Sequence, residues 1–111
     1  MDSEERLKAK VTQNPGSILV AVINGIAIGN VFITDDWGPF FFRLAVRKDF
    51  RGKGVGRKLV DAVEERVKEK GYKELYMLVA DEDTELKDLY HRWGFGDGNL
   101  YRFMFKGLGD S

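Results

Sequence analysis

Cysteine is absent from the sequence, and its absence excludes disulfide bonds, thiolate metal sites and a cysteine nucleophile. Histidine is almost absent too, since His91 stands alone and a His-rich metal site is therefore excluded. We expect no bound metal. A chain without cysteine suits a reducing compartment, and we expect the protein to be cytoplasmic.

Long apolar runs and an excess of one charge are also missing. No run approaches the length that spans a bilayer, and the charged N-terminal residues lack the apolar stretch of a signal peptide. The 18 basic and 18 acidic side chains cancel, which excludes a global polycation that coats nucleic acid. We therefore expect a single domain over residues 1–111, with neither a membrane nor a nucleic acid as partner.

Apolar periodicity and turn residues predict an alternation of strands and helices. Helices are expected where apolar residues recur every three or four positions, weakly at 4–13 and clearly at 54–70 and from about 84 to 93. Strands are expected in runs rich in β-branched and aromatic residues, at 17–23, 26–33, 40–46, 75–80 and 100–106. Asn24-Gly25 is the strongest hairpin signal, and Asn14-Pro15-Gly16 predicts a turn.

This order of elements predicts an α/β fold. The strand, helix and strand over residues 40–80 imply one right-handed parallel crossover. The hairpins that precede them imply antiparallel pairing. We therefore expect a mixed, mostly antiparallel sheet with helices on both faces.

The most informative segment is Arg51-Gly52-Lys53-Gly54-Val55-Gly56-Arg57-Lys58, between a predicted strand and a predicted helix. Three glycines at alternate positions remove side chains that would keep a ligand away from the backbone. The first turn of the following helix offers unpaired N–H groups and a partial positive charge. Together these features predict a cradle for a phosphate or a pyrophosphate.

Local charge favours the same ligand. Residues 43–58 carry seven basic side chains against one acidic side chain, a local net charge of +6 in a neutral chain. A solvated basic turn with glycines chosen for tight geometry is the alternative. The glycine spacing fits neither a Walker A loop, which needs Gly-Lys-Ser/Thr, nor the G-x-G-x-x-G dinucleotide fingerprint.

Two motifs resemble those of a known family. The segment LAVRKDFRGKGVGRKLV resembles the acetyl-CoA-binding motif of the GNAT superfamily of acetyl-CoA-dependent N-acetyltransferases, whose core is R/Q-x-x-G-x-G/A. The segment DLYHRWGF is similar to the family's L-Y-x-x-x-G-F segment, through Leu89, Tyr90, Gly94 and Phe95. Both motifs occur in order with a strand between them, and the resemblance covers roughly residues 15–106.

The resemblance implies a cosubstrate site for acetyl-CoA. It implies that the backbone of Leu44, Ala45 and Val46 binds the pantetheine arm and that the Val46 amide faces the thioester carbonyl as an oxyanion donor. It implies that the strands before and after the main helix splay apart around this arm. The pyrophosphate would be held by the loop residues Arg51, Gly52, Lys53, Gly54, Val55, Gly56 and Arg57, with Asp83 as a further cofactor contact.

The resemblance also assigns Tyr90 as the general acid that protonates the leaving thiolate after direct attack by an amine. A phenol of pKa about 10 is a weak donor to a thiolate whose conjugate acid has a pKa of about 8.5, so the transfer needs a local shift or a concerted step. The alternative is an ordinary aromatic residue on an apolar helix face.

The sequence departs from the family pattern in four places. Leu78 stands where some members carry a glutamate base, and residues 40–44 offer no acid either. Asp83 replaces a usual asparagine, and Lys48 replaces a common proline. The strand and helix that begin full-length members are expected to be missing, which opens the acceptor site or an edge of the sheet and makes a homodimer a reasonable hypothesis.

Three functions remain open. The first is a catalytic N-acetyltransferase acting on an amine, the second a non-catalytic acyl-CoA-binding module of the same fold, and the third, ranked far behind, a basic loop that binds nucleic acid. The missing base and the missing front elements motivate the second. The acceptor amine cannot be read from the motifs.

Overall fold

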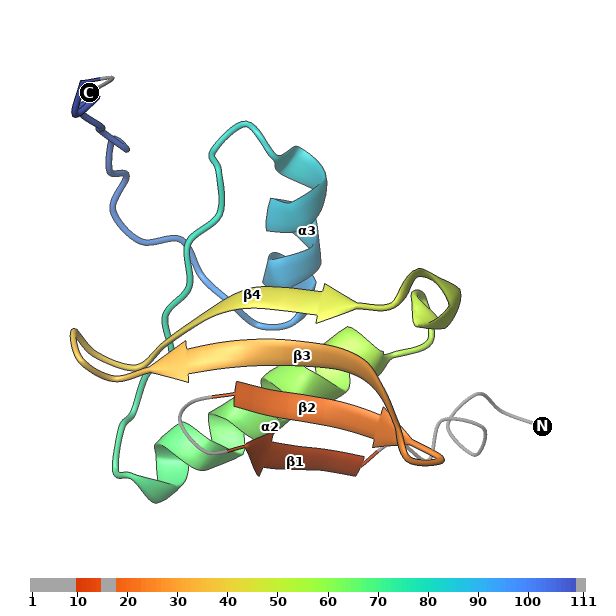
Figure 1. Cartoon of the computed structure of the whole chain (residues 1–111). Helices are drawn as coiled ribbons and strands as arrows, with labels where there is room; N and C mark the ends of the chain where they lie inside the picture. The colour runs from red at the N-terminus through yellow and green to blue at the C-terminus, as the bar shows by residue number, and fades with distance from the viewer. Residues whose placement is uncertain (1–9, 15–17, 110–111) are drawn as a thin grey trace. The chain divides into compact units, whose positions relative to one another are not determined.

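The computed structural model describes residues 10–14 and 18–109 of the chain. Its contacts divide the chain into two compact units, residues 1–79 and residues 80–111. The first unit holds a four-stranded sheet and the main helix, and the second holds a short helix (Figure 1). The prediction of one domain over residues 1–111 stays a prediction.

The sheet of the first unit is antiparallel and follows the order of the chain, β1-β2-β3-β4. Asn24 and Gly25 both have positive φ, 52° and 78°, as the predicted two-residue hairpin requires. The strands predicted at 26–33 and 40–46 are confirmed, and so is the strand predicted at 17–23 over its described residues 18–23. The strands are β1 (Lys10–Asn14), β2 (Ile18–Ile23), β3 (Ile26–Thr34) and β4 (Phe40–Val46).

The helix predicted at 4–13 is wrong wherever the structure describes it. Lys10–Asn14 is a strand, paired antiparallel with β2 from Lys10 opposite Val22 to Asn14 opposite Ile18. The apolar spacing was weak, and pairing with a neighbouring strand outweighs a weak helical preference. Residues 4–9 and the Pro15-Gly16 part of the predicted turn lie outside the described residues.

The predicted helix at 54–70 is confirmed as α2 (Val55–Glu69), which lies across one face of the sheet (Figure 1). Its apolar stripe is buried against β2 and β3, at Val55, Leu59, Val60, Val63 and Val67. The other wall of this core is formed by Leu19, Ala21, Ile28, Val31, Ile33 and Phe41. Burying each valine, leucine, isoleucine or phenylalanine among them contributes about 1.5–3 kcal/mol.

Close packing under the helix depends on Gly29. A Cβ at Gly29 would lie 2.9 Å from the carbonyl oxygen of Ala45, 3.2 Å from Leu59 Cδ1 and 3.3 Å from Val55 Cγ1. Contacts this short force neighbouring atoms to move. Gly29 therefore lets the first turns of α2 approach the sheet where β3 meets the end of β4.

Strand β4 contains a bulge near its middle. Phe42 pairs with Phe32 and Ala45 pairs with Asn30, so Arg43 and Leu44 together oppose Val31. Arg43 takes a φ of 54°, which residues other than glycine, asparagine and aspartate rarely adopt. The bulge bends the strand and re-aims the backbone of its last residues.

We expect Arg43→Gly to be nearly neutral for stability and Arg43→Val to be clearly destabilising. Glycine relieves a left-handed conformation that costs an L-residue about 1–2 kcal/mol. The substitution also removes the guanidinium from the Phe32 ring, 6.0 Å away, an exposed contact that contributes about 0.5–1 kcal/mol. Urea denaturation would measure the free energy of unfolding, and equal losses in both variants would contradict the strain.

The strand predicted at 75–80 is wrong except at one residue. Tyr76 forms an isolated parallel bridge with Phe40, in which the Phe41 amide donates to the Tyr76 carbonyl at 3.1 Å and the Tyr76 amide donates to the Pro39 carbonyl at 2.8 Å. The bulge farther along β4 breaks the regular spacing that a parallel neighbour needs. The two segments therefore part after this bridge, and the parallel direction of the predicted crossover is confirmed there.

The second unit contains the predicted second helix, α3 (Thr84–Arg92). The strand predicted at 100–106 is wrong, because residues 100–106 form neither a helix nor a strand. A strand needs a hydrogen-bonded neighbour, and the alternating pattern of this segment cannot supply one. Its apolar side chains are exposed instead, at Leu100, Tyr101, Phe103, Met104 and Phe105.

Candidate functional site: the end of β4 and the start of α2

The site begins at the free edge of β4. Strand β3 occupies one edge of β4, and the bridge at Tyr76 occupies only the beginning of the other. Within the described residues, no strand pairs with this second edge from Phe42 to Val46. The backbone of Leu44, Ala45 and Val46 thus lies at the end of the outer strand, and its second edge is not paired with any described strand.

The peptide groups of Val46 point to that second edge. The Arg47 amide donates to the Ile28 carbonyl of β3 at 2.8 Å. Successive residues of a strand direct their backbone groups to opposite edges, so the N–H and C=O of Val46 face away from β3. The C=O accepts a hydrogen bond from Arg51 Nε at 3.0 Å.

The chain then forms residues 51–57, named the phosphate loop after the ligand that the sequence predicts for it. A single 3-10 turn, η1 (Lys48–Phe50), leads into it. Gly52 and Gly54 have φ of 74° and 88°, and a Cβ at either would meet no protein atom within 4 Å. The glycines therefore supply the left-handed turns and leave the outer side of the loop open to a ligand.

The loop ends at the N-terminus of α2. Gly54 is the N-cap, and the first intrahelical bond runs from the Lys58 amide to the Gly54 carbonyl at 3.0 Å. The amides of Val55 and Gly56 precede that bond, so no helical carbonyl is available to them. The first turn carries no acidic residue. An anion placed here meets N–H groups and the positive end of the helix dipole.

The basic side chains around the loop are exposed and form surface ion pairs and a cation–π contact. Arg57 binds Asp61 and Arg47 binds Asp49, both at 3.2 Å, and Lys53 Nζ lies 5.7 Å from the centre of the Phe50 ring. Exposed ion pairs contribute about 0.2–1 kcal/mol. These contacts are weak enough to exchange for a more highly charged phosphate.

The remaining predicted site residues lie on α3, in the second unit. Asp83 is the N-cap of α3 and accepts a hydrogen bond from the Leu86 amide at 3.0 Å, as expected for a capping carboxylate. Tyr90 is only 5% exposed, and its ring packs edge-on against Trp93 and Phe95, with centroids 5.3 and 5.4 Å apart. Burial raises the pKa of the Tyr90 phenol. Leu44 to Val46 and the phosphate loop are thus brought together in one unit, and Asp83 and Tyr90 in the other.

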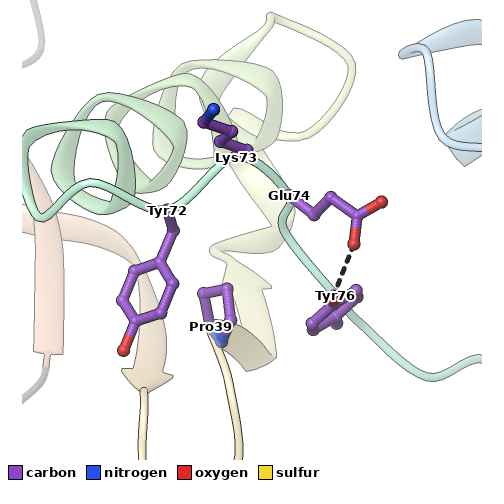
Figure 2. Close-up of a pocket in the computed structure, with 5 residues that line it drawn as sticks. All are labelled: Pro39, Tyr72, Lys73, Glu74 and Tyr76. Carbon is purple, nitrogen blue, oxygen red and sulfur yellow. Dashed lines mark hydrogen bonds between the residues drawn. The ribbon is translucent and has the colours of Figure 1, made fainter.

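Sequence reasoning missed two features of the first unit. The contact between Arg51 and Val46 joins residues five positions apart across a turn, and no periodicity signals it. The second feature is an open pocket of about 340 Å³ at the beginning of β4, lined by Pro39, Tyr72, Lys73, Glu74 and Tyr76 (Figure 2). The only sequence signal for it is Glu74 two residues before Tyr76, which places both side chains on one side of an extended segment.

Within this pocket the Tyr76 hydroxyl donates to Glu74 Oε1 at 2.6 Å (Figure 2). This hydrogen bond, together with the negative charge of Glu74, raises the pKa of Tyr76. Because the pKa of Tyr76 is higher in the folded state, its hydrogen bond to Glu74 stabilises the fold fully below the unfolded-state pKa of about 10. This stabilisation is lost as the pH rises through the folded-state pKa.

We therefore expect Tyr76 to ionise at a higher pH than an ordinary tyrosine, and Glu74→Gln to return its pKa toward about 10. Absorbance at 295 nm would follow phenolate formation, and subtracting the curve of Tyr76→Phe would isolate Tyr76 from the other tyrosines. Identical curves with and without Glu74 would contradict the hydrogen bond as the cause.

Comparison with known proteins identifies the family. The model of the Acetyltransferase (GNAT) family matches residues 1–95. The chain belongs to this family. An acetyltransferase of Pectobacterium atrosepticum is 27% identical over 93 residues, which cover 82% of this chain and 65% of that protein. The chain thus spans just under two thirds of the length of this relative.

Solved GNAT structures share the fold. The aminoglycoside N-acetyltransferase AAC(6')-Iy, in complex with the bisubstrate analogue CoA-S-monomethyl-acetylneamine, superposes with a TM-score of 0.69 at 25% identity, over 82% of this chain and 69% of that one. A GNAT acetyltransferase of Elizabethkingia anophelis with acetyl-CoA bound gives a TM-score of 0.69 at 26% identity, over 76% of this chain and 56% of that one. The predicted α/β GNAT fold is confirmed.

Two further results concern the described residues alone. None of the helices among them is long and apolar enough to cross a membrane. Residues 10–14 and 18–109 also contain no cluster of three or more histidine, aspartate or glutamate side chains that could hold a metal ion.

Proposed function

We propose that this GNAT domain is an N-acetyltransferase that moves the acetyl group of acetyl-CoA to a primary amine by direct attack. The observation that carries the proposal is the phosphate loop, where left-handed Gly52 and Gly54 leave the backbone open at the positive end of α2. The open edge of β4 supports it, since it leads directly into that loop. Two GNAT neighbours bind the same class of ligand, acetyl-CoA in one and a CoA-based analogue in the other.

In this proposal the loop amides from Gly52 to Arg57 hold the pyrophosphate, and the backbone of Leu44 to Val46 holds the pantetheine arm. The Val46 amide donates to the thioester oxygen as negative charge develops on it. Asp83 is proposed as a further cofactor contact, as the family resemblance implies, in addition to its role as the N-cap of α3. Holding the two reactants together supplies a large part of the acceleration.

We propose Tyr90 as the general acid for the leaving thiolate. Because burial raises its pKa, the phenol is fully protonated at neutral pH and ready to donate. The same shift makes complete transfer to a thiolate, whose conjugate acid has a pKa of about 8.5, more uphill than in water. The proton therefore moves in concert with cleavage of the carbon–sulfur bond.

For deprotonation of the amine we propose a water molecule. Two of the four candidate loop acids, Asp35, Asp36, Asp81 and Glu82, already have partners. Asp35 binds Lys70 Nζ at 3.3 Å and accepts from the Tyr72 hydroxyl at 3.4 Å, and Asp81 binds Lys87 Nζ at 3.1 Å. Leu78 is exposed and apolar where some family members carry an acid. An alkyl ammonium has a pKa of about 10, so activity is expected to rise with pH through the neutral range.

A thiol-release assay with acetyl-CoA tests the function across polyamines, aminoglycosides, amino acids and peptides. Release that depends on one class of amine is the expected result. The absence of an acid along β4 favours one alternative, a non-catalytic acyl-CoA-binding module. Acetyl-CoA binding without release for any amine would establish that alternative, and no binding at all would refute both.

We also propose a homodimer in the cytoplasm. The sheet supports the dimer, because no described strand covers the outer edge of β1, and a second copy can pair with that edge. Light scattering tests it, since a molar mass equal to one 12.7 kDa chain would exclude it.

A further inference from the structure

The hydrogen bond from Arg51 Nε to the Val46 carbonyl has a geometry that phosphate binding alone does not explain. Arg51 is the first residue of the phosphate loop, and Val46 is the last residue of β4. The 3.0 Å contact therefore ties the two halves of the proposed cosubstrate site directly to each other.

This hydrogen bond lies on the edge of β4 that has no neighbouring strand among residues 10–14 and 18–109. In the inner strands of the sheet a backbone carbonyl is held by a neighbouring strand, but the Val46 carbonyl faces away from β3. Three residues earlier, Arg43 introduces the left-handed turn of the bulge. The Val46 carbonyl thus lies close to the bulge and has no neighbouring described strand to bond with. The Arg51 guanidinium donates the hydrogen bond that a strand would otherwise supply.

We propose that Arg51 is a positioning residue that fixes the peptide groups of Val46 and aligns the end of β4 with the phosphate loop. This inference rests on the proposed function. The N–H and C=O of Val46 point to the same side, so holding the carbonyl also fixes the direction of the amide that faces the thioester. A planar guanidinium is well suited to this task, because its donors are rigidly oriented.

The chemical requirement is an N–H donor four bonds from Cα. In arginine Nε occupies that place, and in glutamine Nε2 occupies it as well, without a charge. Lysine keeps the charge but has a carbon atom there, with its ammonium group one bond farther away. Arg51→Gln and Arg51→Lys therefore separate the hydrogen bond from the charge.

The experiment compares wild-type protein with Arg51→Gln, Arg51→Lys and, as a matched control, Arg47→Lys, whose exposed arginine pairs with Asp49 instead of the backbone. Three quantities are measured: CoA affinity by calorimetry, kcat with an acceptor found in the thiol-release assay, and the carbonyl 13C chemical shift of Val46. This shift reports the hydrogen bond whether or not the protein turns over. Arg51 is exposed, so each variant is expected to fold.

We expect Arg51→Gln to keep the wild-type carbonyl shift and to have a higher kcat than Arg51→Lys. Arg51→Lys should lose the shift and lower kcat by about 10- to 100-fold, the scale of small misplacements at a reacting centre, with CoA affinity little changed. Arg47→Lys should leave the carbonyl shift unaltered. The proposal expects CoA affinity to be retained in both Arg51 variants. Loss of CoA affinity in Arg51→Gln but not in Arg51→Lys would overturn it in favour of direct charge on the phosphate. If wild-type protein binds no CoA, the proposed function fails, and the carbonyl shifts still decide whether Arg51 holds Val46.

Discussion

Replacing Gly54 with glutamate should abolish CoA binding and leave the protein folded. A side chain at this position would project into the open space of the phosphate loop and place a negative charge at the start of α2. Hydrogen bonds to a charged group contribute about 1.5–3 kcal/mol each, so blocking even two of them weakens binding by roughly 100-fold or more. Isothermal titration calorimetry with CoA measures the effect.

Gly25→Glu is the matched control for this variant. Gly25 has a similar φ, 78° against 88°, and a Cβ there would also meet no atom within 4 Å, but it lies in the β2–β3 hairpin. Both variants carry the same new charge and a similar strain of about 1–2 kcal/mol. CoA affinity should persist in Gly25→Glu. Undiminished affinity in Gly54→Glu would refute the assignment of the phosphate loop.

The second large effect is expected for Tyr90→Phe, which should slow turnover and spare the affinity for acetyl-CoA. Phenylalanine keeps the edge-on contacts with Trp93 and Phe95 and removes the hydroxyl group. General acid catalysis contributes about 10²- to 10⁴-fold, so kcat should fall by about 100-fold or more. Steady-state kinetics with saturating acetyl-CoA, together with a binding measurement, separates the two quantities.

Tyr101→Phe serves as the control, because Tyr101 is 82% exposed and lies outside the proposed site. It removes the same atom and should leave kcat unchanged. Should Tyr90→Phe turn over as fast as wild-type protein, Tyr90 is a structural residue of the second unit. A loss of folded protein in Tyr90→Phe, seen by circular dichroism, would lead to the same conclusion.

The elements that the sequence predicted well are those with strong local signals. Asn24-Gly25 adopts the two left-handed conformations of its turn, and the stripe from Val55 to Val67 faces the core at helical spacing. The left-handed glycines of the phosphate loop and the N-cap of α2 also follow from residues adjacent in the chain. In each case neighbours along the sequence decide the conformation.

The errors concern segments whose structure is decided by distant residues. Lys10–Asn14 becomes a strand because β2 offers an edge for pairing. Residues 75–80 have a strand-like composition, but the partner strand is bulged at Arg43, and only Tyr76 pairs. The contact of Arg51 with Val46 likewise depends on a turn that closes in three dimensions. Composition and periodicity do not predict such pairings.

Gly29 extends the site well beyond the motif that marks it. It pairs with Val46 in the sheet and faces Val55 at the first turn of α2, so one missing side chain sets the depth at which the helix sits beside the strand. A mutational survey limited to the glycine-rich motif would overlook it. For protein engineering, the proposed functional unit therefore includes β3. A methyl group at Gly29 would change the spacing between the end of β4 and the start of α2, the two proposed binding segments, without contacting the cosubstrate itself.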